Sequence, residues 1–483
     1  MNLNQTLQEK YPHLEVSVLK LSEAQKDNES KRIDSEYFKK EYLENEELLK
    51  KFNLFYFESN NVVSGPFGST LTSESYRKDG ICFIRVQDIK GGFFVEKESL
   101  VKISESDNNK IKHSQLRYGD FVISKVGNSI GYVAEIPEDI NICNISENNI
   151  GLKTIGLETY TKKYILVFLN SKYGQLQIWR RISGNAQPKI NVADFTKIKI
   201  PILPMEFQLE IQTLVKDSYK ALEESKELYK KAEETLYLEL GLDPKNSLQS
   251  LLDSKTNNPT KSLNISIHTL KESFLKTGRL DSEYYQSKYE DIEKFIKSYS
   301  NGYDSFSNII NSKDTNFTPK NNENYSYIEL ANIGNNGNIS EPISDLGKNL
   351  PTRARRIVSK GDVIISSIEG SLSSCALITQ EFDKHLVSTG FFVLNSKLLN
   401  GETLLVMFKS QIFQEYLKKF PSGTILCAIN KEELSKILIP KIDPTTQEKI
   451  AKYIQESFNL RKKSKQLLDN AKIKVEEQIQ GNK

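Results

Sequence analysis

Apolar and polar positions along this chain follow two different periods. Short runs such as "ICFIRVQDI", "GDFVISKVG" and "GDVIISSIEG" show the alternation or the continuous apolar character of strands. Two later segments, from about Glu206 and about Pro444, repeat their apolar positions every seven residues, as long helices do. We therefore predict an α+β fold in which two β-rich domains are joined by two long helices.

Several phrases occur twice along the chain, in the same order. "RIDSEYFKKEY" begins at Arg32 and "RLDSEYYQSKY" at Arg279. "LEVSVLKLSE", "GDFVIS" and "SGNAQPKINVADFTKIKIPI" likewise have counterparts in "LNISIHTLKE", "GDVIIS" and "SGTILCAINKEELSKILIPK". "LEVSVLKLSE" and its counterpart "LNISIHTLKE" each predict a short strand, and "DSEY" predicts a short capped helix in each copy. The chain is therefore a pseudo-repeat with halves near 1–245 and 246–483.

The repeats divide the chain into five predicted segments. They are a first β-rich domain at 1–205, a long helix at 206–245, a polar linker at 246–262, a second β-rich domain at 263–443 and a second long helix at 444–483.

One row of heptad positions carries the same residue types in both long helices, and we name it the helix-pairing seam. It consists of Ile211, Ser218, Ser225 and Ala232 in the first helix and Ile450, Ser457, Ser464 and Ala471 in the second. Small side chains allow two helix backbones to approach closely. Each helix could instead pack on its own domain, but the repetition of the row favours pairing as an antiparallel coiled coil.

Length and composition narrow the class of protein. A chain of 483 residues exceeds what one hydrophobic core usually serves. The four cysteines, Cys82, Cys143, Cys375 and Cys427, show no C-x-x-C spacing, so we expect a reduced, cytoplasmic protein without a zinc site. We find no apolar run of about 18 residues for a spanning helix and no signal-peptide core. The net charge is only +3, so a role with nucleic acid must come from local patches.

Catalytic motifs are missing from the sequence. We find no G-x-G-x-x-G after a strand, no phosphate-binding loop and no Ser/His/Asp or Cys/His arrangement. "NNPT" at Asn257 lacks the second proline and the aromatic residue of an amino-methyltransferase loop. The triplet "ESK" at Glu224 fits a solvated helix face better than a nuclease site. We therefore predict a non-catalytic protein without cofactor or metal.

The repeated motifs carry a resemblance to a known family. Each half contains a "GDxxIS" phrase and closes with "SG-x(5)-IN-x(3)-[FL]-x-KI-x-IP" and a long helix, and this order resembles the specificity subunit of type I restriction-modification enzymes over nearly the whole chain. "SGPFGSTLTSESYRKDGICFIRVQDI" in the first half is similar to the opening of their target-recognition domains. The second half lacks the Gly-Pro-Phe-Gly turn and has "SGTILCAIN" in place of "SGNAQPKIN".

The resemblance implies a DNA-reading adaptor of a phage-defence system. Each target-recognition domain would read one part of a split target in double-stranded DNA. The paired helices would space these parts and dock two methyltransferase subunits, with restriction subunits as further partners. S-adenosylmethionine, ATP and Mg are then expected only in the partner subunits. The sequence also leaves open a fused or diverged DNA methyltransferase or nuclease, and a coiled-coil DNA-binding scaffold without restriction partners.

DNA contacts are expected from local groups of basic and amide side chains, with solvated surface charge as the alternative. The candidates are Arg77, Lys78, Arg180, Arg181, Asn185, Gln187, Lys189, Arg353, Arg355, Arg356, Lys418 and Lys419. The three arginines of "TRARR" are expected just before a strand, as a phosphate clamp. Gly65, Pro66 and Gly68 are predicted to form a turn, and the single tryptophan, Trp179, is predicted to lie in the core.

Overall fold

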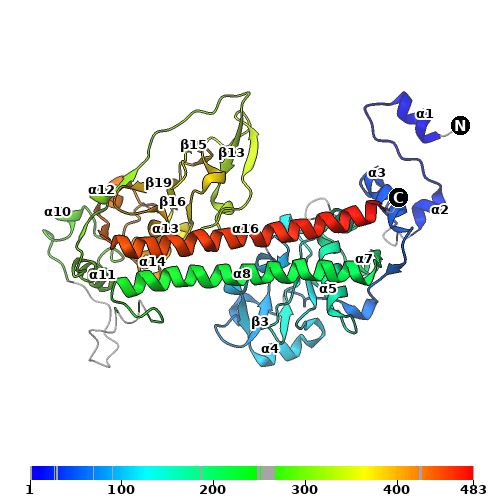
Figure 1. Cartoon of the computed structure of the whole chain (residues 1–483), viewed down its shortest axis with the longest axis horizontal. Helices are drawn as coiled ribbons and strands as arrows, with labels where there is room; N and C mark the ends of the chain where they lie inside the picture. Colours follow the sequence, from blue (N-terminus) through cyan, green and yellow to red (C-terminus); the bar gives the residue numbers. More distant parts are fainter. Residues whose placement is uncertain are drawn as a thin grey trace. The chain divides into compact units, whose positions relative to one another are not determined.

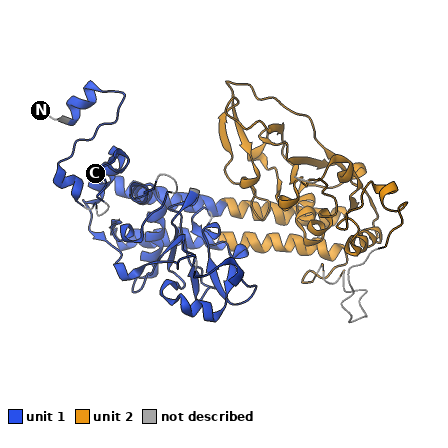
Figure 2. Ribbon diagram, turned by 180° about the vertical axis from the view of Figure 1, so that it is seen from behind, with its two compact units in different colours: residues 1–220, 463–483 blue, residues 221–462 orange. Residues whose placement is uncertain are grey.

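The computed structural model describes residues 3–26, 28, 31–68, 70–89, 91–184, 188–246, 248, 251, 267–423 and 427–481. The chain forms two compact units, which are coloured separately in Figure 2. Unit 1 contains residues 1–220 and 463–483, and unit 2 contains residues 221–462. Unit 1 therefore draws on both ends of the sequence, whereas unit 2 is one continuous stretch.

Unit 1 is built on a mixed sheet of five strands in the order β2-β9-β6-β7-β4. Their bounds are β2 Val62–Ser64, β4 Phe93–Phe94, β6 Phe121–Ser124, β7 Val133–Glu135 and β9 Asn149–Leu152. A second sheet has the order β5-β3-β8, with β3 at Ile81–Ile84, β5 at Val101–Ile103 and β8 at Cys143–Ile145. Strands β1 (Leu54–Phe55) and β10 (Ile200–Pro201) form a separate antiparallel pair.

The central strand β6 is buried on both faces. Phe121 and Ile123 belong to the core that contains helix α5 (Thr159–Asn170), whereas Val122 belongs to a second core with residues of β3 and β8. A strand covered on both sides must be apolar throughout, which explains the unbroken "FVI" run. The remaining α-helices of unit 1 are α1 Leu3–Lys10, α2 Leu21–Gln25, α3 Lys40–Leu49, α4 Glu105–Lys110, α6 Lys172–Arg180 and α7 Val192–Phe195.

Unit 2 contains two sheets of four strands. One has the order β12-β19-β16-β17, with β12 Ile310–Ser312, β16 Val363–Ser366, β17 Cys375–Leu377 and β19 Phe391–Ser396. The other has the order β14-β13-β18-β15, with β13 Asn324–Ile328, β14 Ile343–Leu346, β15 Ala354–Ile357 and β18 Leu386–Ser388. Strands β11 (Tyr303–Ser305) and β20 (Leu438–Pro440) pair by themselves. The shorter α-helices are α10 Phe274–Thr277, α11 Ser287–Lys297, α12 Phe306–Ile309, α13 Gly401–Lys409, α14 Gln411–Leu417 and α15 Lys431–Lys436.

Figure 1 labels two long helices, α8 (Met205–Glu239) and α16 (Pro444–Gly481). In the sequence, α8 follows the short strand β10 and α16 follows β20. The two helices begin at the residues where the heptad pattern begins. Each helix contributes residues to both units. The chain as a whole is thus a mixed α/β protein of short strands and long helices.

The helix-pairing seam is buried in both units, and its serines are in contact. In unit 1 the hydroxyl oxygens of Ser218 and Ser464 lie 2.8 Å apart, and Ser218 is also 3.0 Å from the carbonyl oxygen of Ser464. In unit 2 the hydroxyl oxygens of Ser225 and Ser457 lie 3.0 Å apart, and Ser457 donates to the Ser225 carbonyl at 2.7 Å. From Ser218 to Ser225 the position on α8 advances by seven residues, and the contacting serine on α16 changes from Ser464 to Ser457, seven residues earlier.

The first predicted short strand, at Leu14 to Glu23, is wrong. Residues 14–20 have no regular structure, and α2 follows them. Side chains of α1 take the backbone donors that a partner strand would need: the Gln8 side chain accepts from the Val16 N–H at 3.3 Å and the Asn4 side chain from the Val18 N–H at 2.6 Å. Of the counterpart strand expected at 263–272, residues 267–272 are described and contain no strand. The predicted linker at 246–262 lies largely outside the described residues.

No helix in the described ranges combines the length and the apolar character needed to cross a membrane.

Candidate nucleic-acid interface

An open cleft of about 830 Å³ lies in unit 1. Its apolar wall includes Phe67, Leu71 and Phe83. Its polar lining consists of Tyr76, Arg85, Gln87, Ser129, Tyr132, Ser146, Glu147 and Asn148. The cleft therefore offers hydrogen-bonding groups around an apolar wall, the combination that suits a flat, polar-edged ligand.

The cleft forms where four strands end. Strands β2 and β6 both run antiparallel to β9, so their carboxyl ends meet at one edge of the five-stranded sheet. Strands β3 and β8 are parallel, and the Ser146 N–H just after β8 donates to the Ile84 carbonyl at the end of β3 at 2.9 Å. The segments after these four strands therefore converge, and they supply most of the polar lining.

The "GPFGS" turn is fitted closely against the segment after β8. A Cβ atom on Gly65 would lie 2.0 Å from the Ser146 carbonyl oxygen, so only glycine allows this approach. The Gly68 N–H donates to the Glu147 carboxylate at 2.6 Å. These glycines, predicted only as turn formers, thus also bring two loops of the cleft together.

Two lysines lie beside the Glu147 segment. The Lys125 ammonium donates to the Glu147 carbonyl at 3.1 Å, and the Ile190 N–H donates to the Lys125 carbonyl at 3.2 Å, next to exposed Lys189. Burial lowers the pKa of the Lys125 ammonium, the charge of Lys189 lowers it further, and the Glu147 carboxylate raises it. A second anion near the two lysines would offset more of the repulsion between them.

The predicted contacts Arg180 and Arg181 are buried in unit 1, which argues against direct DNA contact. Arg180 forms an ion pair with Glu46 and donates to the Tyr37 carbonyl at 3.0 Å, while Arg181 donates to the Gln177 carbonyl at 2.9 Å. Both guanidinium groups satisfy internal acceptors. By contrast, Trp179, predicted in the core, is 45% exposed, because consecutive residues of α6 point in different directions.

The other predicted contacts of unit 1 have separate surroundings. Arg77 and Lys78 are both exposed, and the backbone of Arg77 pairs with Lys102. Lys189 is the predicted residue that the structure brings next to the cleft. Asn185 and Gln187 lie outside the described residues.

The repeated "RIDSEY" phrase forms an arginine clasp on the end of α6. The Arg32 guanidinium binds both carboxylate oxygens of Asp34, at 2.7 and 2.6 Å, and donates to the Ile182 carbonyl at 2.6 Å. Asp34 in turn accepts from the Tyr37 N–H at 3.2 Å. The last carbonyls of a helix lack intrahelical donors and carry partial negative charge, so the clasp stabilises this end and fixes the loop that follows.

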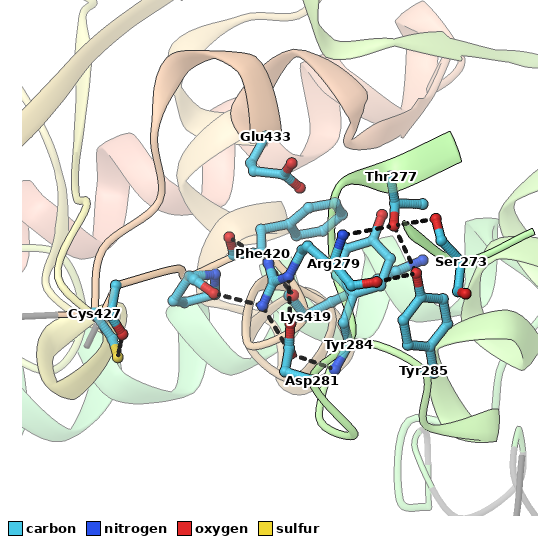
Figure 3. A network of polar contacts seen from close by, with 12 residues as sticks. Ser273, Thr277, Arg279, Asp281, Tyr284, Tyr285, Lys419, Phe420, Cys427 and Glu433 are labelled. Carbon is cyan, nitrogen blue, oxygen red and sulfur yellow. Dashed lines mark hydrogen bonds and ion pairs between the residues drawn. The ribbon is translucent and has the colours of Figure 1, made fainter. Parts of the chain in front are cut away.

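An arginine clasp of the same form occurs in unit 2 (Figure 3). The Arg279 guanidinium binds Asp281 at 2.7 and 2.9 Å and donates to the carbonyls of Phe420 and Pro421 at 3.2 and 2.9 Å, just after α14. Lys419, a predicted DNA contact, pairs instead with Glu293 at 2.5 Å.

The Lys419 ammonium also lies 4.9 Å from the centre of the Tyr284 ring, so its charge is used inside unit 2. Lys418 is exposed and pairs with Glu415 at 2.7 Å.

The loops of unit 2 are tied together by backbone bonds. The Ile429 N–H donates to the Ser367 carbonyl at 2.8 Å, and the Ser367 N–H donates to the Gly390 carbonyl at 2.9 Å. Ile368 forms an isolated bridge with Ala428. Unit 1 has the equivalent bonds. Its Ile190 N–H donates to the Lys125 carbonyl at 3.2 Å, its Lys125 N–H donates to the Asn148 carbonyl at 2.9 Å, and Val126 forms a bridge with Lys189.

The "TRARR" arginines differ in their surroundings. Arg355 and Arg356 lie inside strand β15 and not before it, because residues 354–357 pair with β18. Arg356 is half-buried and donates to the Phe391 carbonyl, and burial lowers its pKa. Arg355 donates to the Thr318 hydroxyl at 3.1 Å, and Arg353 is exposed. Of the three, Arg353 is best suited to meet a phosphate.

The described part of the chain contains no group of three or more His, Cys, Asp or Glu side chains placed to hold a metal ion.

Comparison with known proteins identifies the domain that holds the cleft. Residues 68–234 match the family model of the type I restriction modification DNA specificity domain. The chain is also 30% identical over 159 residues to the type I restriction enzyme HindI specificity subunit of Haemophilus influenzae, an alignment that covers 32% of this chain and 33% of that relative.

Solved structures of two subunits align with most of the chain at low similarity. The type I S subunit from M. genitalium is 14% identical, with coverage of 88% of this chain and 96% of that chain and a TM-score of 0.39. The HsdS subunit from Thermoanaerobacter tengcongensis is 13% identical, with coverage of 90% and 96% and a TM-score of 0.25. Residues 68–234 are therefore similar to the type I restriction modification DNA specificity domain, and the matched part spans about a third of the curated relative.

Proposed function

We propose that the chain is the DNA sequence-specificity subunit of a type I restriction-modification complex. The observation that carries this proposal is the family match, because residues 68–234 include nearly all the side chains that line the cleft. Recognition of a duplex needs cations for phosphates and polar groups for base edges. Lys125 and Lys189 supply the first beside the cleft, and its polar lining supplies the second.

The second half is proposed to read a second part of the target. The two arginine clasps and the equivalent loop bonds support a duplicated framework. The side chains on this framework differ: Lys125 corresponds to Ser367, and Lys189 to Ala428. Two domains that recognise different DNA sequences can share one backbone framework if the side chains on it differ.

We further propose that α8 and α16 pair as an antiparallel coiled coil that spaces the two half-sites. The serine contacts in each unit support this register. A helix of 35 residues is about 50 Å long at 1.5 Å per residue, which exceeds one DNA turn of about 34 Å. Methyltransferase subunits, two in number, and restriction subunits would bind this scaffold. S-adenosylmethionine, ATP and Mg would belong to those partners, and the chain itself would have no catalytic activity.

The experiment that tests the proposal is sequencing of methylated bases in a genome with and without this gene. A split motif that is methylated only when the gene is present would support a specificity subunit. Methylation by the isolated chain with S-adenosylmethionine would contradict it and favour a fused methyltransferase. Unchanged methylation, with a chain that binds DNA but no methyltransferase, would favour a scaffold without restriction partners.

A further inference from the structure

The cleft of unit 1 contains an exposed carboxylate, that of Glu147. The charge of Lys125 attracts this carboxylate, but no close ion pair joins Glu147 to a basic side chain in the described ranges. Two like charges repel across water, and burial of the space between them strengthens the repulsion. The Glu147 carboxylate therefore repels DNA phosphates, so attraction to the duplex does not explain why an acid lies in the cleft.

The Glu147 side chain is held in one orientation. One carboxylate oxygen, Oε2, accepts from the Gly68 N–H at 2.6 Å, and a Cβ atom on Gly68 would lie 2.8 Å from the other oxygen, Oε1. The Lys125 ammonium holds the carbonyl of the same residue. The side chain is thus fixed from two directions, and a carboxylate with about four lone-pair sites has acceptor capacity left.

An ionised carboxylate can only accept hydrogen bonds, and in the major groove the donors are the exocyclic amino groups of cytosine and adenine. Phosphates and the acceptor edges of guanine and thymine repel it. Among base contacts, glutamate is therefore suited to an amino group, and cytosine N4 is its usual partner.

We propose that Glu147 is a specificity-determining residue that accepts a hydrogen bond from the exocyclic amino group of one base in the half-site read by unit 1. This inference rests on the function proposed above. The alternative role for Glu147 is to hold the Gly68 loop, and two substitutions separate the two roles.

Glu147→Gln keeps an acceptor for the Gly68 N–H. The amide oxygen then takes that bond, and the NH₂ group occupies the place of the second oxygen, where it meets the base amino group donor to donor. Glu147→Ala removes both interactions. Glu138→Gln is the matched control, because Glu138 is an exposed acid of the same unit that does not line the cleft.

The measurement is the methylated motif in cells that contain the full complex with each variant. Glu147→Gln is expected to lose roughly tenfold preference at one position of one half-site, with the other half-site and the spacer unchanged. The wild-type base at that position, cytosine or adenine, identifies the amino group. Glu138→Gln is expected to leave the motif unchanged.

Two results would overturn the inference. If Glu147→Gln keeps the wild-type motif while Glu147→Ala lowers methylation evenly at all positions, Glu147 only holds the loop. If the wild-type complex methylates no split motif that depends on this gene, the proposed function fails first, and the inference fails with it.

Discussion

The lysines beside the cleft, Lys125 and Lys189, lead to a prediction about salt dependence. Each lysine that neutralises a phosphate releases counterions, so its replacement by alanine should lower the slope of log K against log salt by about 0.9. The methylated motif should stay the same, because phosphates carry no sequence information. Titration of the full complex with a duplex that contains the motif, at several salt concentrations, measures the slope.

The control for the lysine variants is Lys51→Ala, since Lys51 is exposed and does not line the cleft. Equal slopes for the wild type and both cleft variants would show that these lysines do not contact phosphates.

The partly buried acid Glu46 leads to a prediction about pH. Burial alone would raise the pKa of its carboxyl, but Lys199 and Arg180 outweigh burial and lower the pKa to about 2. A lowered pKa stabilises the fold above the unfolded value near 4.5, and this contribution is lost as the pH falls toward 2. The free energy of unfolding of the wild type should therefore drop between about pH 5 and pH 2.

Glu46→Gln should reduce that drop and destabilise the protein at pH 7 by about 3 to 5 kcal/mol, because Arg180 and Lys199 lose their counterion. Denaturant unfolding as a function of pH measures both effects. Glu44→Gln, on the exposed side of the same helix, should stay within about 1 kcal/mol. A Glu46→Gln variant with wild-type stability at pH 7 would contradict the proposed charge balance.

Single residues were the hardest features to predict from the sequence. The adjacent charges of Arg180 and Arg181 do not show whether the side chains face solvent or the interior, and both side chains are buried. Lys125 and Glu147 were not predicted, because neither belongs to a cluster of basic or amide residues in the sequence. The available signal was their position, since each follows shortly after a buried β-strand.

At the scale of elements, the helix-pairing seam leads to a packing prediction. Ser225 is fully buried against Ser457, so Ser225→Leu must push the two helices apart, at a cost of about 1 to 3 kcal/mol. Methylation at the split site should fall as well, if helix pairing sets the distance between readers. Thermal unfolding and the methylation assay of the full complex measure the two effects.

Glu227→Leu is the matched control on the same helix, because Glu227 is exposed, and its effect should stay within about 0.5 kcal/mol. If Ser225→Leu is as mild as this control, the helices do not require small residues here.

Elements with a strong local period were predictable, and those defined by distant partners were not. The heptads located α8 and α16 to within a residue at their starts. The strand expected at Leu14 to Glu23 failed because alternation cannot show that a partner strand is missing. Likewise, the parallel pairing of β3 with β8 joins residues about 60 positions apart, and no local pattern encodes it.

At the scale of the whole molecule, the short β1–β10 pair leads to a prediction about domain exchange. Leu54 lies opposite Pro201, so the two ends of the segment between them are neighbours. If the chain reads a split target as proposed, replacement of residues 54–201 by the matching segment of a specificity subunit with a different target should change one half-site and leave the other half-site and the spacer intact. The methylated motif of the chimera measures this, and a change in both half-sites would contradict independent reading.

Unit 1 is completed by residues that follow unit 2 in the sequence. Leu468, Val475 and Ile479 of α16 are part of the core that contains β6 and α5, yet unit 2 is synthesised before them. At 5 to 20 residues per second, the first part of unit 1 waits roughly 10 to 50 s for its final helix. During that time its apolar face is a target for chaperones and proteases, and a chain that stops short of α16 keeps that face uncovered. Synthesis of this part of α16 is therefore the step that lets the core of unit 1 close.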